Sequence, residues 1–184
     1  MNALRYFVEF ENNAARHDNR EGQRLWLQPG LVTFSVKING EFKPISGLNG
    51  PITFSKPEDL NMNVFCMYAL RASVAKHLVD PRNLEFGDSF AVLNDGDEFL
   101  RRVRRAAEQA SLALEIRMVE YVNEREYQGE MGIFRKSSAF AYQSELRIAL
   151  KPGTGAPYRL QVGDLTDITF AGPLSDLNQL LKVD

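Results

Sequence analysis

The chain of 184 residues has 22 basic and 24 acidic side chains, a formal net charge of -2 and a hydrophobic fraction of 44%. This composition is that of a globular domain with a substantial core and excludes a disordered chain. The near-zero net charge excludes a global electrostatic attraction to nucleic acid or membranes, so any such attraction must come from a local patch. A single cysteine, Cys66, excludes an internal disulfide.

Neither a secretory signal nor an apolar run of membrane length is visible in the sequence. We therefore expect a cytoplasmic protein without membrane contact. The two histidines, His17 and His77, have no partner at metal-ligand spacing, which predicts that no structural metal is bound. Cys66 lies in the apolar run NVFCMYAL, which favours a small buried hydrophobe over a reactive thiol.

The first third of the chain predicts strands and one hairpin. Apolar alternation over residues 4–10 indicates a strand with Arg5 on its mixed face. The alternating run over residues 32–38 is followed by Asn39 and Gly40 and by a second extended run, which is typical of a type I′ hairpin. The segment PITFS predicts a short strand, and residues 61–70 predict a buried strand that leads into a short helical stretch over residues 71–78.

The strongest helical pattern covers residues 97–112. Its apolar stripe consists of Phe99, Val103, Ala106, Ala107 and Ala110, and its cap candidates are Asn94, Asp95 and Asp97. Arginines occupy positions 101, 102, 104 and 105 on the other side of this helix. They suit phosphate contacts, but a solvated helix face balanced by nearby acidic residues is the favoured interpretation.

The last third predicts a strand over residues 114–122, a charged loop over residues 124–132 and a strand over residues 140–150. Two further strands over residues 158–162 and 167–171 precede a short C-terminal helix with Leu177, Leu180 and Leu181 directed inward. We expect a single α+β domain over residues 1–184. Its sheet should be mostly antiparallel and hairpin-connected, continuous or split, with one main helix and smaller helices.

A row of polar groups coincides with the predicted strand over residues 140–150. Strand alternation places Gln143, Glu145 and Arg147 on one face, opposite an apolar face. This row is either a functional site, reached through the charged loop before it, or the solvated face of an antiparallel strand. Phosphate-binding glycine loops and the GxSxG nucleophile motif are both absent from the sequence.

The run that contains this row resembles uncharacterised bacterial and phage protein families whose chains end in an F-x-K, Y-x-x-E-x-R strand. The matching residues are Phe134, Lys136, Tyr142, Glu145 and Arg147, followed by a GDL-x-DI segment over residues 163–168. This resemblance covers about the last third of the chain and implies no established activity. Phe134, Lys136 and Arg147 are candidates for recognition of a ligand or partner.

A looser resemblance is to the ADP-ribosyltransferase superfamily. The elements that carry it, in chain order, are Arg5, then Thr53 and Ser55 in PITFS, then Gln143 and Glu145 in YQSE. The resemblance implies that NAD is the substrate, that Arg5 holds its phosphates and that Thr53 and Ser55 support the nicotinamide pocket. It further implies that Glu145 stabilises the oxocarbenium-like transition state and that Gln143 helps to select the acceptor.

Three functions therefore stand as expectations. The first is ADP-ribose transfer from NAD to a protein or nucleic acid, or hydrolysis of NAD, with Tyr142 stacking on the nicotinamide or the acceptor. The second is a non-catalytic interaction protein, a phage- or defence-related factor, that acts through exposed aromatic residues and the loop over residues 124–132. The third is nucleic-acid binding through the arginine-rich helix.

Overall fold

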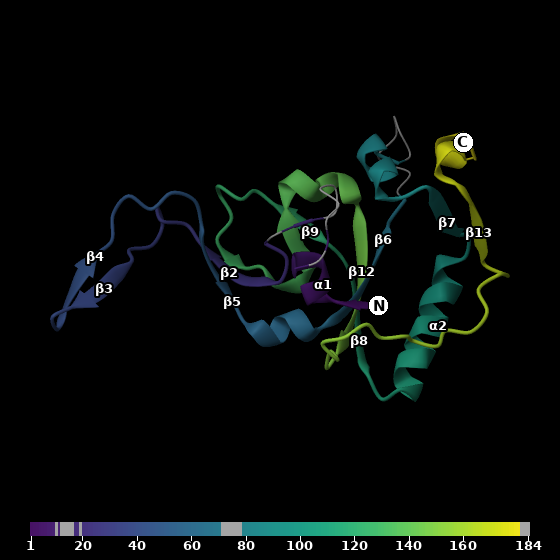
Figure 1. Ribbon diagram of the computed structural model, residues 1–184, viewed down its shortest axis with the longest axis horizontal. Coiled ribbons are helices and arrows are strands. Elements are labelled where there is room, and N and C mark those ends of the chain that lie inside the picture. Colours follow the sequence, from purple (N-terminus) through teal and green to yellow (C-terminus); the bar gives the residue numbers. More distant parts are fainter. Residues whose placement is uncertain (10, 12–16, 19, 71–78, 181–184) are drawn as a thin grey trace.

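The computed structural model describes residues 1–9, 11, 17–18, 20–70 and 79–180. Its main sheet has four strands in the order β1 (Asn2–Ala3), β6 (Asn63–Tyr68), β12 (Glu145–Lys151) and β8 (Ala113–Met118). Each neighbouring pair is antiparallel (Figure 1). Smaller antiparallel ribbons and a few helices surround this sheet, so the predicted α+β class is confirmed.

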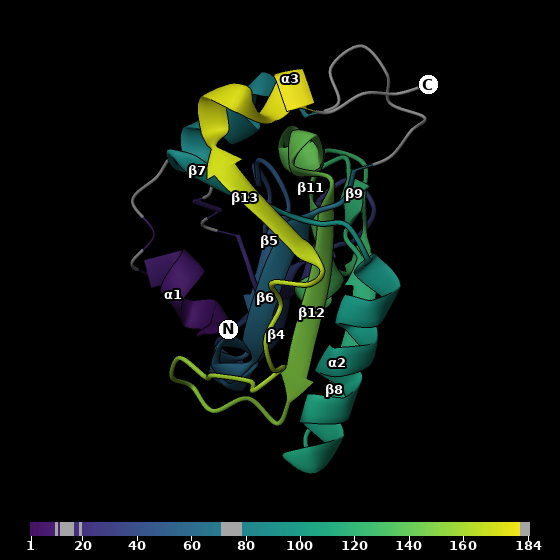
Figure 2. The same ribbon diagram turned by 90° about the vertical axis from the view of Figure 1, so that its right-hand side faces the viewer.

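Helix α2 (Gly96–Gln109) covers one face of the main sheet and lies along β8 and β12 (Figure 2). Phe99 and Val103 from the predicted apolar stripe pack against Ile148 of β12 and against Ile168. Among the cap candidates, the side chain of Asp95 accepts a hydrogen bond from the backbone N–H of Glu98 at 2.9 Å. The periodic stripe therefore predicted this helix correctly.

The other face of the sheet carries a second core built from the N-terminus. Leu4 is fully buried and packs with Val64, Ala149 and residues of the 3₁₀ helix η3 (Gly132–Phe134). The predicted strand over residues 4–10 is wrong, because only Asn2–Ala3 pair with β6 and Leu4–Glu9 form helix α1. Leu4 and Phe7 contact this core at helical spacing, so tertiary packing overrides the alternating pattern.

A second, three-stranded sheet has the order β10 (Gly129–Glu130), β2 (Gln23–Leu27) and β5 (Ile52–Ser55). Its centre is Trp26, which is fully buried against Val122 and Met131. Next to it, β9 (Glu120–Val122) and β11 (Arg135–Ser137) form a parallel pair. This parallel pairing brings the residues after β11 back towards the main sheet.

Strands β3 (Ser35–Ile38) and β4 (Glu41–Pro44) form the predicted hairpin. Asn39 and Gly40 have φ angles of 51° and 90°, the positive values that a type I′ turn requires. Residues 29–51 project from the rest of the molecule (Figure 1), and we call this segment the arm. No residue of the arm is buried.

The C-terminal part forms the ribbon of β7 (Ser89–Leu93) and β13 (Thr169–Pro173) and ends in the 3₁₀ helix η5 (Leu174–Asp176) and helix α3 (Leu177–Leu180). The predicted strand over residues 158–162 is wrong, because this segment has no regular structure. Leu177 is buried, as predicted, but Leu180 is 55% exposed. The predicted helix over residues 71–78 and residue Leu181 lie outside the described residues.

Candidate functional site

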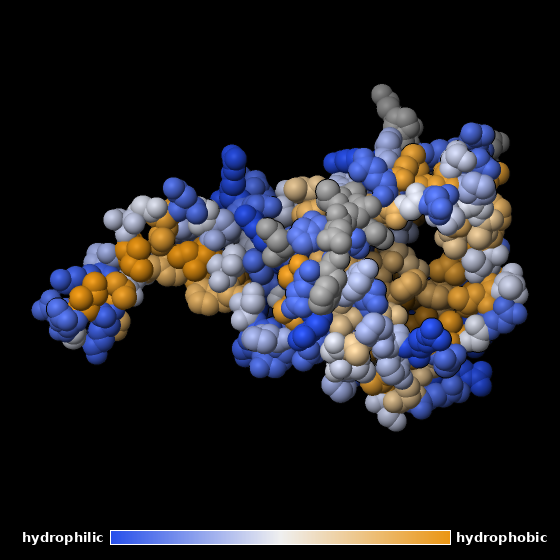
Figure 3. All heavy atoms as spheres, viewed as in Figure 1, coloured by the Kyte–Doolittle hydropathy of each residue, from blue (hydrophilic) through white to orange (hydrophobic). Residues whose placement is uncertain are grey.

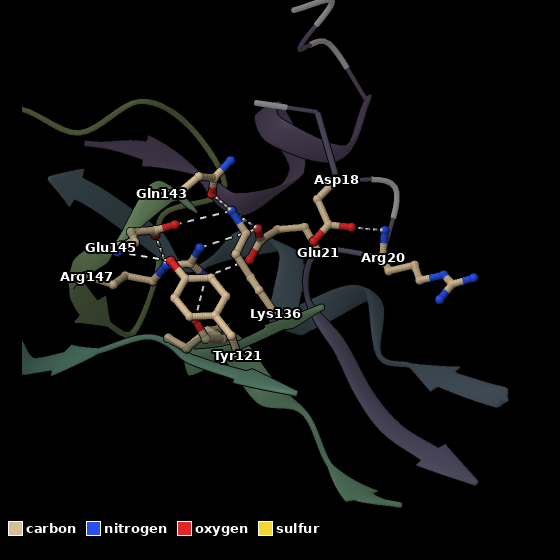
Figure 4. Close-up of polar contacts among 9 residues, drawn as sticks. Asp18, Arg20, Glu21, Tyr121, Lys136, Gln143, Glu145 and Arg147 are labelled. Carbon is tan, nitrogen blue, oxygen red and sulfur yellow. Dashed lines mark hydrogen bonds and ion pairs between the residues drawn. The ribbon is translucent and has the colours of Figure 1, made fainter. Parts of the chain in front are cut away.

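The predicted polar row is part of a buried network of four charged side chains (Figure 4). The ammonium of Lys136 lies 3.2 Å from a carboxylate oxygen of Glu145 and 3.3 Å from one of Glu21. The guanidinium of Arg147 contacts the same two carboxylates, at 2.7 Å and 2.6 Å respectively. The four residues are only 1% to 7% exposed. The solvated strand face is therefore excluded for Glu145 and Arg147.

Different parts of the chain supply these side chains. Alternation along β12 places Glu145 and Arg147 on one face, and β11 contributes Lys136. Glu21 comes from the segment before β2, just ahead of Gly22, where an added Cβ would lie 2.8 Å from the side chain of Leu4. Close packing against the N-terminal core therefore holds Glu21 in position. The polar sequence around Glu21 contains no pattern that predicts its place in the network.

Gln143 reaches the network from outside the strand. It ends the 3₁₀ helix η4 (Ser138–Gln143), and Ser144, with a φ of 41°, separates this helix from β12. The prediction that residues 140–150 form one strand is therefore wrong for the first half of that segment. The side-chain oxygen of Gln143 accepts a hydrogen bond from Lys136 at 2.8 Å, so the predicted neighbour of Glu145 is nevertheless close to it.

Further contacts occupy the remaining polar atoms. Arg147 also donates to the backbone carbonyl of Ile133, and the backbone N–H of Glu145 donates to the Tyr121 hydroxyl at 3.0 Å. The ring of Phe140 lies 5.4 Å from the Lys136 ammonium. Low solvent access and multiple partners make each charge part of a satisfied buried network.

The charges of this network strengthen one another's ionised forms. Burial alone would raise the pKa of Glu145, but the nearby charges of Arg147 and Lys136 outweigh it and lower this pKa to about 2. Burial alone would lower the pKa of Lys136, but Glu21 and Glu145 raise it above its ordinary value. A general acid or base works best with a pKa near neutrality. The network therefore suits a structural role better than proton transfer.

Two other titratable groups border the network. Burial and the charge of Glu21 raise the pKa of Asp18, whose carboxylate accepts the backbone N–H of Arg20 at 2.9 Å (Figure 4). Burial raises the pKa of the Cys66 thiol. The thiol is therefore protonated at neutral pH, as expected of an unreactive cysteine, although Cys66 is only partly buried.

The residues that the resemblance assigns to NAD lie on three separate elements. Arg5 is on α1, where its guanidinium donates to the side chain of Asn61 at 3.0 Å. Thr53 and Ser55 are on β5, which pairs with β2 in the three-stranded sheet, and Glu145 is on β12 in the main sheet. The carboxylate of Glu145 is ionised at neutral pH, but Lys136 and Arg147 already engage both of its oxygens.

The predicted aromatic candidates have different environments. Phe134 is 6% exposed, and the guanidinium of Arg117 lies 4.3 Å from the centre of its ring. Tyr142 lies on η4 with the guanidinium of Arg82 4.0 Å from its ring centre. Phe134 is thus a core residue of the described structure, whereas Tyr142 belongs to a cation–π pair next to the network.

The predicted recognition loop over residues 124–132 is docked on β2. The side-chain amide of Gln28 donates to the backbone carbonyls of Glu124 and Tyr127, both at 2.8 Å. The backbone N–H of Met131 donates to the carbonyl of Arg24 at 2.8 Å. These contacts hold the backbone of the loop against β2 and against Gln28, the residue that follows it.

The arginine-rich face of α2 borders an open groove of about 430 Å³, with residues 161–164 on the other side. Arg101 and Arg102 both bond to the carboxylate of Glu98, at 2.6 Å and 2.7 Å. Arg102 also pairs with Asp167. Two of the four arginines are therefore ion-paired within the protein, which favours the balanced helix face for this half of the cluster.

Other classes of site find no support among the described residues. Within 1–9, 11, 17–18, 20–70 and 79–180, no group of three or more His, Cys, Asp or Glu side chains could hold a metal ion. None of the helices in these ranges has the length and apolar character needed to cross a membrane. Comparison with protein-family models, with curated proteins and with solved structures finds no match.

Proposed function

We propose that this α+β protein is a non-catalytic interaction protein that binds another protein through its arm. The observation that carries this proposal is the exposure of large apolar side chains on the arm: Val36, Ile38 and Ile45 are each 44% to 45% exposed. With Phe34 they lie on one side of the hairpin, which Glu41 and Lys43 share, because directly opposed and alternate residues share a face. We call the four apolar residues of this side, Phe34, Val36, Ile38 and Ile45, the apolar face of the arm.

The arm buries too little surface to be stable by itself, so binding to a partner would stabilise it. An isolated two-stranded hairpin is at best marginally stable in water. Ordering the backbone costs about 1–2 kcal/mol per residue, and the arm offsets little of this cost by burial. Figure 3 shows hydrophobic residues gathered along the projecting arm. A protein surface that covers them would supply the missing stabilisation.

The composition of the arm favours a protein over nucleic acid. Its charged residues are Lys37, Glu41 and Lys43, two positive charges and one negative, so its net charge is +1. Nucleic-acid binding depends on neutralising several phosphates, which this charge does not support. An apolar centre with few charges is typical of the core of a protein–protein interface.

The buried network supports the same conclusion through its contacts. Glu145 is 5% exposed, and its carboxylate is bonded to two cations. Stabilisation of an oxocarbenium-like transition state would require this carboxylate to face a bound dinucleotide, and the network would have to open first. ADP-ribose transfer is therefore the less favoured proposal.

The test compares proteins captured from a lysate of the source cells by three tagged forms. These are the wild-type chain, a variant with Ile38→Ser and Ile45→Ser, and the matched control Phe42→Ser on the opposite face of the hairpin. We expect the double substitution to lose partners that the control retains, with unchanged thermal unfolding of the body. Identical captured sets would refute the proposal, as would nicotinamide release from NAD that Glu145→Gln abolishes while the protein stays folded.

A further inference from the structure

The two outer edges of the arm differ in their hydrogen-bonding capacity. Across the Asn39–Gly40 turn, Ile38 and Glu41 form a hydrogen-bonded pair, so the backbone groups of alternate residues point outward. On β3 the outward groups belong to Ser35 and Lys37, and on β4 to Phe42 and Pro44. Proline has no N–H, so β3 is the edge with a full set of donors and acceptors.

Among the described residues, no strand pairs with this edge of β3. The sheet that contains β3 has only β4 as its second strand, and every residue of β3 is exposed. Proteins usually protect an exposed strand edge with proline, with an inward-facing charged residue or with a covering element, because an unprotected edge can pair with a strand of another chain. On β3 only Lys37 is charged, and it lies on the face opposite the apolar one.

We propose that two copies of this chain pair antiparallel through β3, about a two-fold axis at Val36. The sequence of residues 34–38, Phe-Ser-Val-Lys-Ile, is self-complementary in this register. Val36 lies opposite Val36 of the second copy, Ser35 opposite Lys37, and Phe34 opposite Ile38. Apolar side chains thus meet on one face, and Lys37 does not meet its own copy.

This pairing would raise the stability of the arm above that of an isolated hairpin. Two ribbons become one four-stranded antiparallel sheet, and three or more strands with an apolar face are the minimum for a stable sheet. The two-fold axis uses the same edge on both copies and closes the assembly as a dimer. The apolar faces of the two arms become one surface of double width. The inference therefore rests on the proposed function and names the first partner of the arm.

The first experiment measures mass by sedimentation equilibrium over a range of concentrations. Ser35→Pro removes an outward N–H of β3 and spares the ladder within the hairpin, so we expect dimerisation to weaken by about tenfold or more. Phe42→Pro places the same residue on the outer edge of β4 and should leave the dissociation constant within about threefold. A wild-type chain that stays monomeric, or equal effects of the two prolines, would overturn the pairing.

The second experiment locates the axis with cysteines. Opposed residues at a non-hydrogen-bonded antiparallel position have Cα atoms about 4.5 Å apart, within reach of a disulfide. Val36→Cys should therefore form a disulfide-linked dimer under mild oxidation. Ile38→Cys should not, because its own copy is four residues away along the paired strand. The wild-type protein, whose single cysteine is Cys66, gives the background.

The outcomes separate this inference from the proposed function. Cross-linking of Val36→Cys alone supports the two-fold pairing, and equal cross-linking of both cysteine variants overturns it. If pairing fails while the double variant Ile38→Ser and Ile45→Ser still loses its captured partners, only the dimer is refuted. If the captured set does not change either, the proposed function fails with it.

Discussion

Glu145→Gln tests whether the buried network holds the fold together. The substitution keeps the size of the side chain but removes one of two anions, so Lys136 and Arg147 retain only Glu21 as a charged partner, at 3.3 Å and 2.6 Å. Removing one member of a buried ion pair costs about 3–5 kcal/mol. Since Glu21 still contacts both cations, we expect a loss near the lower end, about 3 kcal/mol.

Urea denaturation measures this loss. With a denaturant dependence of about 2–3 kcal/mol per molar, a loss of about 3 kcal/mol moves the unfolding midpoint down by about 1–1.5 M. Arg24→Gln is the matched control, because Arg24 pairs with Asp59 at 3.1 Å on the surface. This exposed pair should be worth less than about 1 kcal/mol. Equal, small losses for both variants would refute a stabilising role for the network.

Three other changes test the structure. The pKa of Glu145 is lowered from 4.5 to about 2, so its contribution to stability is complete above pH 4.5 and should be lost as the pH falls to 2. Urea denaturation at several pH values across that range measures this loss. Gly153→Ala would place a Cβ 2.0 Å from the backbone oxygen of Asn61, so its melting temperature should drop markedly, whereas Gly87→Ala, with open space, should not change it. Asp95→Ala removes the cap of α2 and should cost about 1 kcal/mol in urea unfolding.

The elements that the sequence predicts correctly have strong local signals. The apolar stripe of α2 and the Asn39–Gly40 turn each depend on residues close together in the chain. The helix α1 and the break at Ser144 do not, because they are fixed by the packing of Leu4 and by the hydrogen bond from the Ser144 hydroxyl to the carbonyl of Ala69, 75 positions earlier. Local alternation is ambiguous wherever a distant contact decides the backbone.

The candidate site shows the same division. The strand period predicts that Glu145 and Arg147 share a face, but not that this face is buried. Burial follows from Glu21 and Lys136, which come from elsewhere in the chain. In the arm the sequence fails to predict exposure instead of burial. Its apolar and polar residues alternate as in any half-buried strand. Only the structure shows that nothing described covers it.

The hydrogen bond between Glu21 and Arg147 joins residues separated by 126 positions along the chain. During synthesis, the carboxylate of Glu21 has neither cationic partner until Lys136 and then Arg147 leave the ribosome. The core around Leu4 likewise waits for Ile133 and Ala149. The N-terminal segment is thus made early and fixed late, and contacts of such long range slow folding. Chains cut short before β12 would expose this unfinished core and would be prone to aggregate.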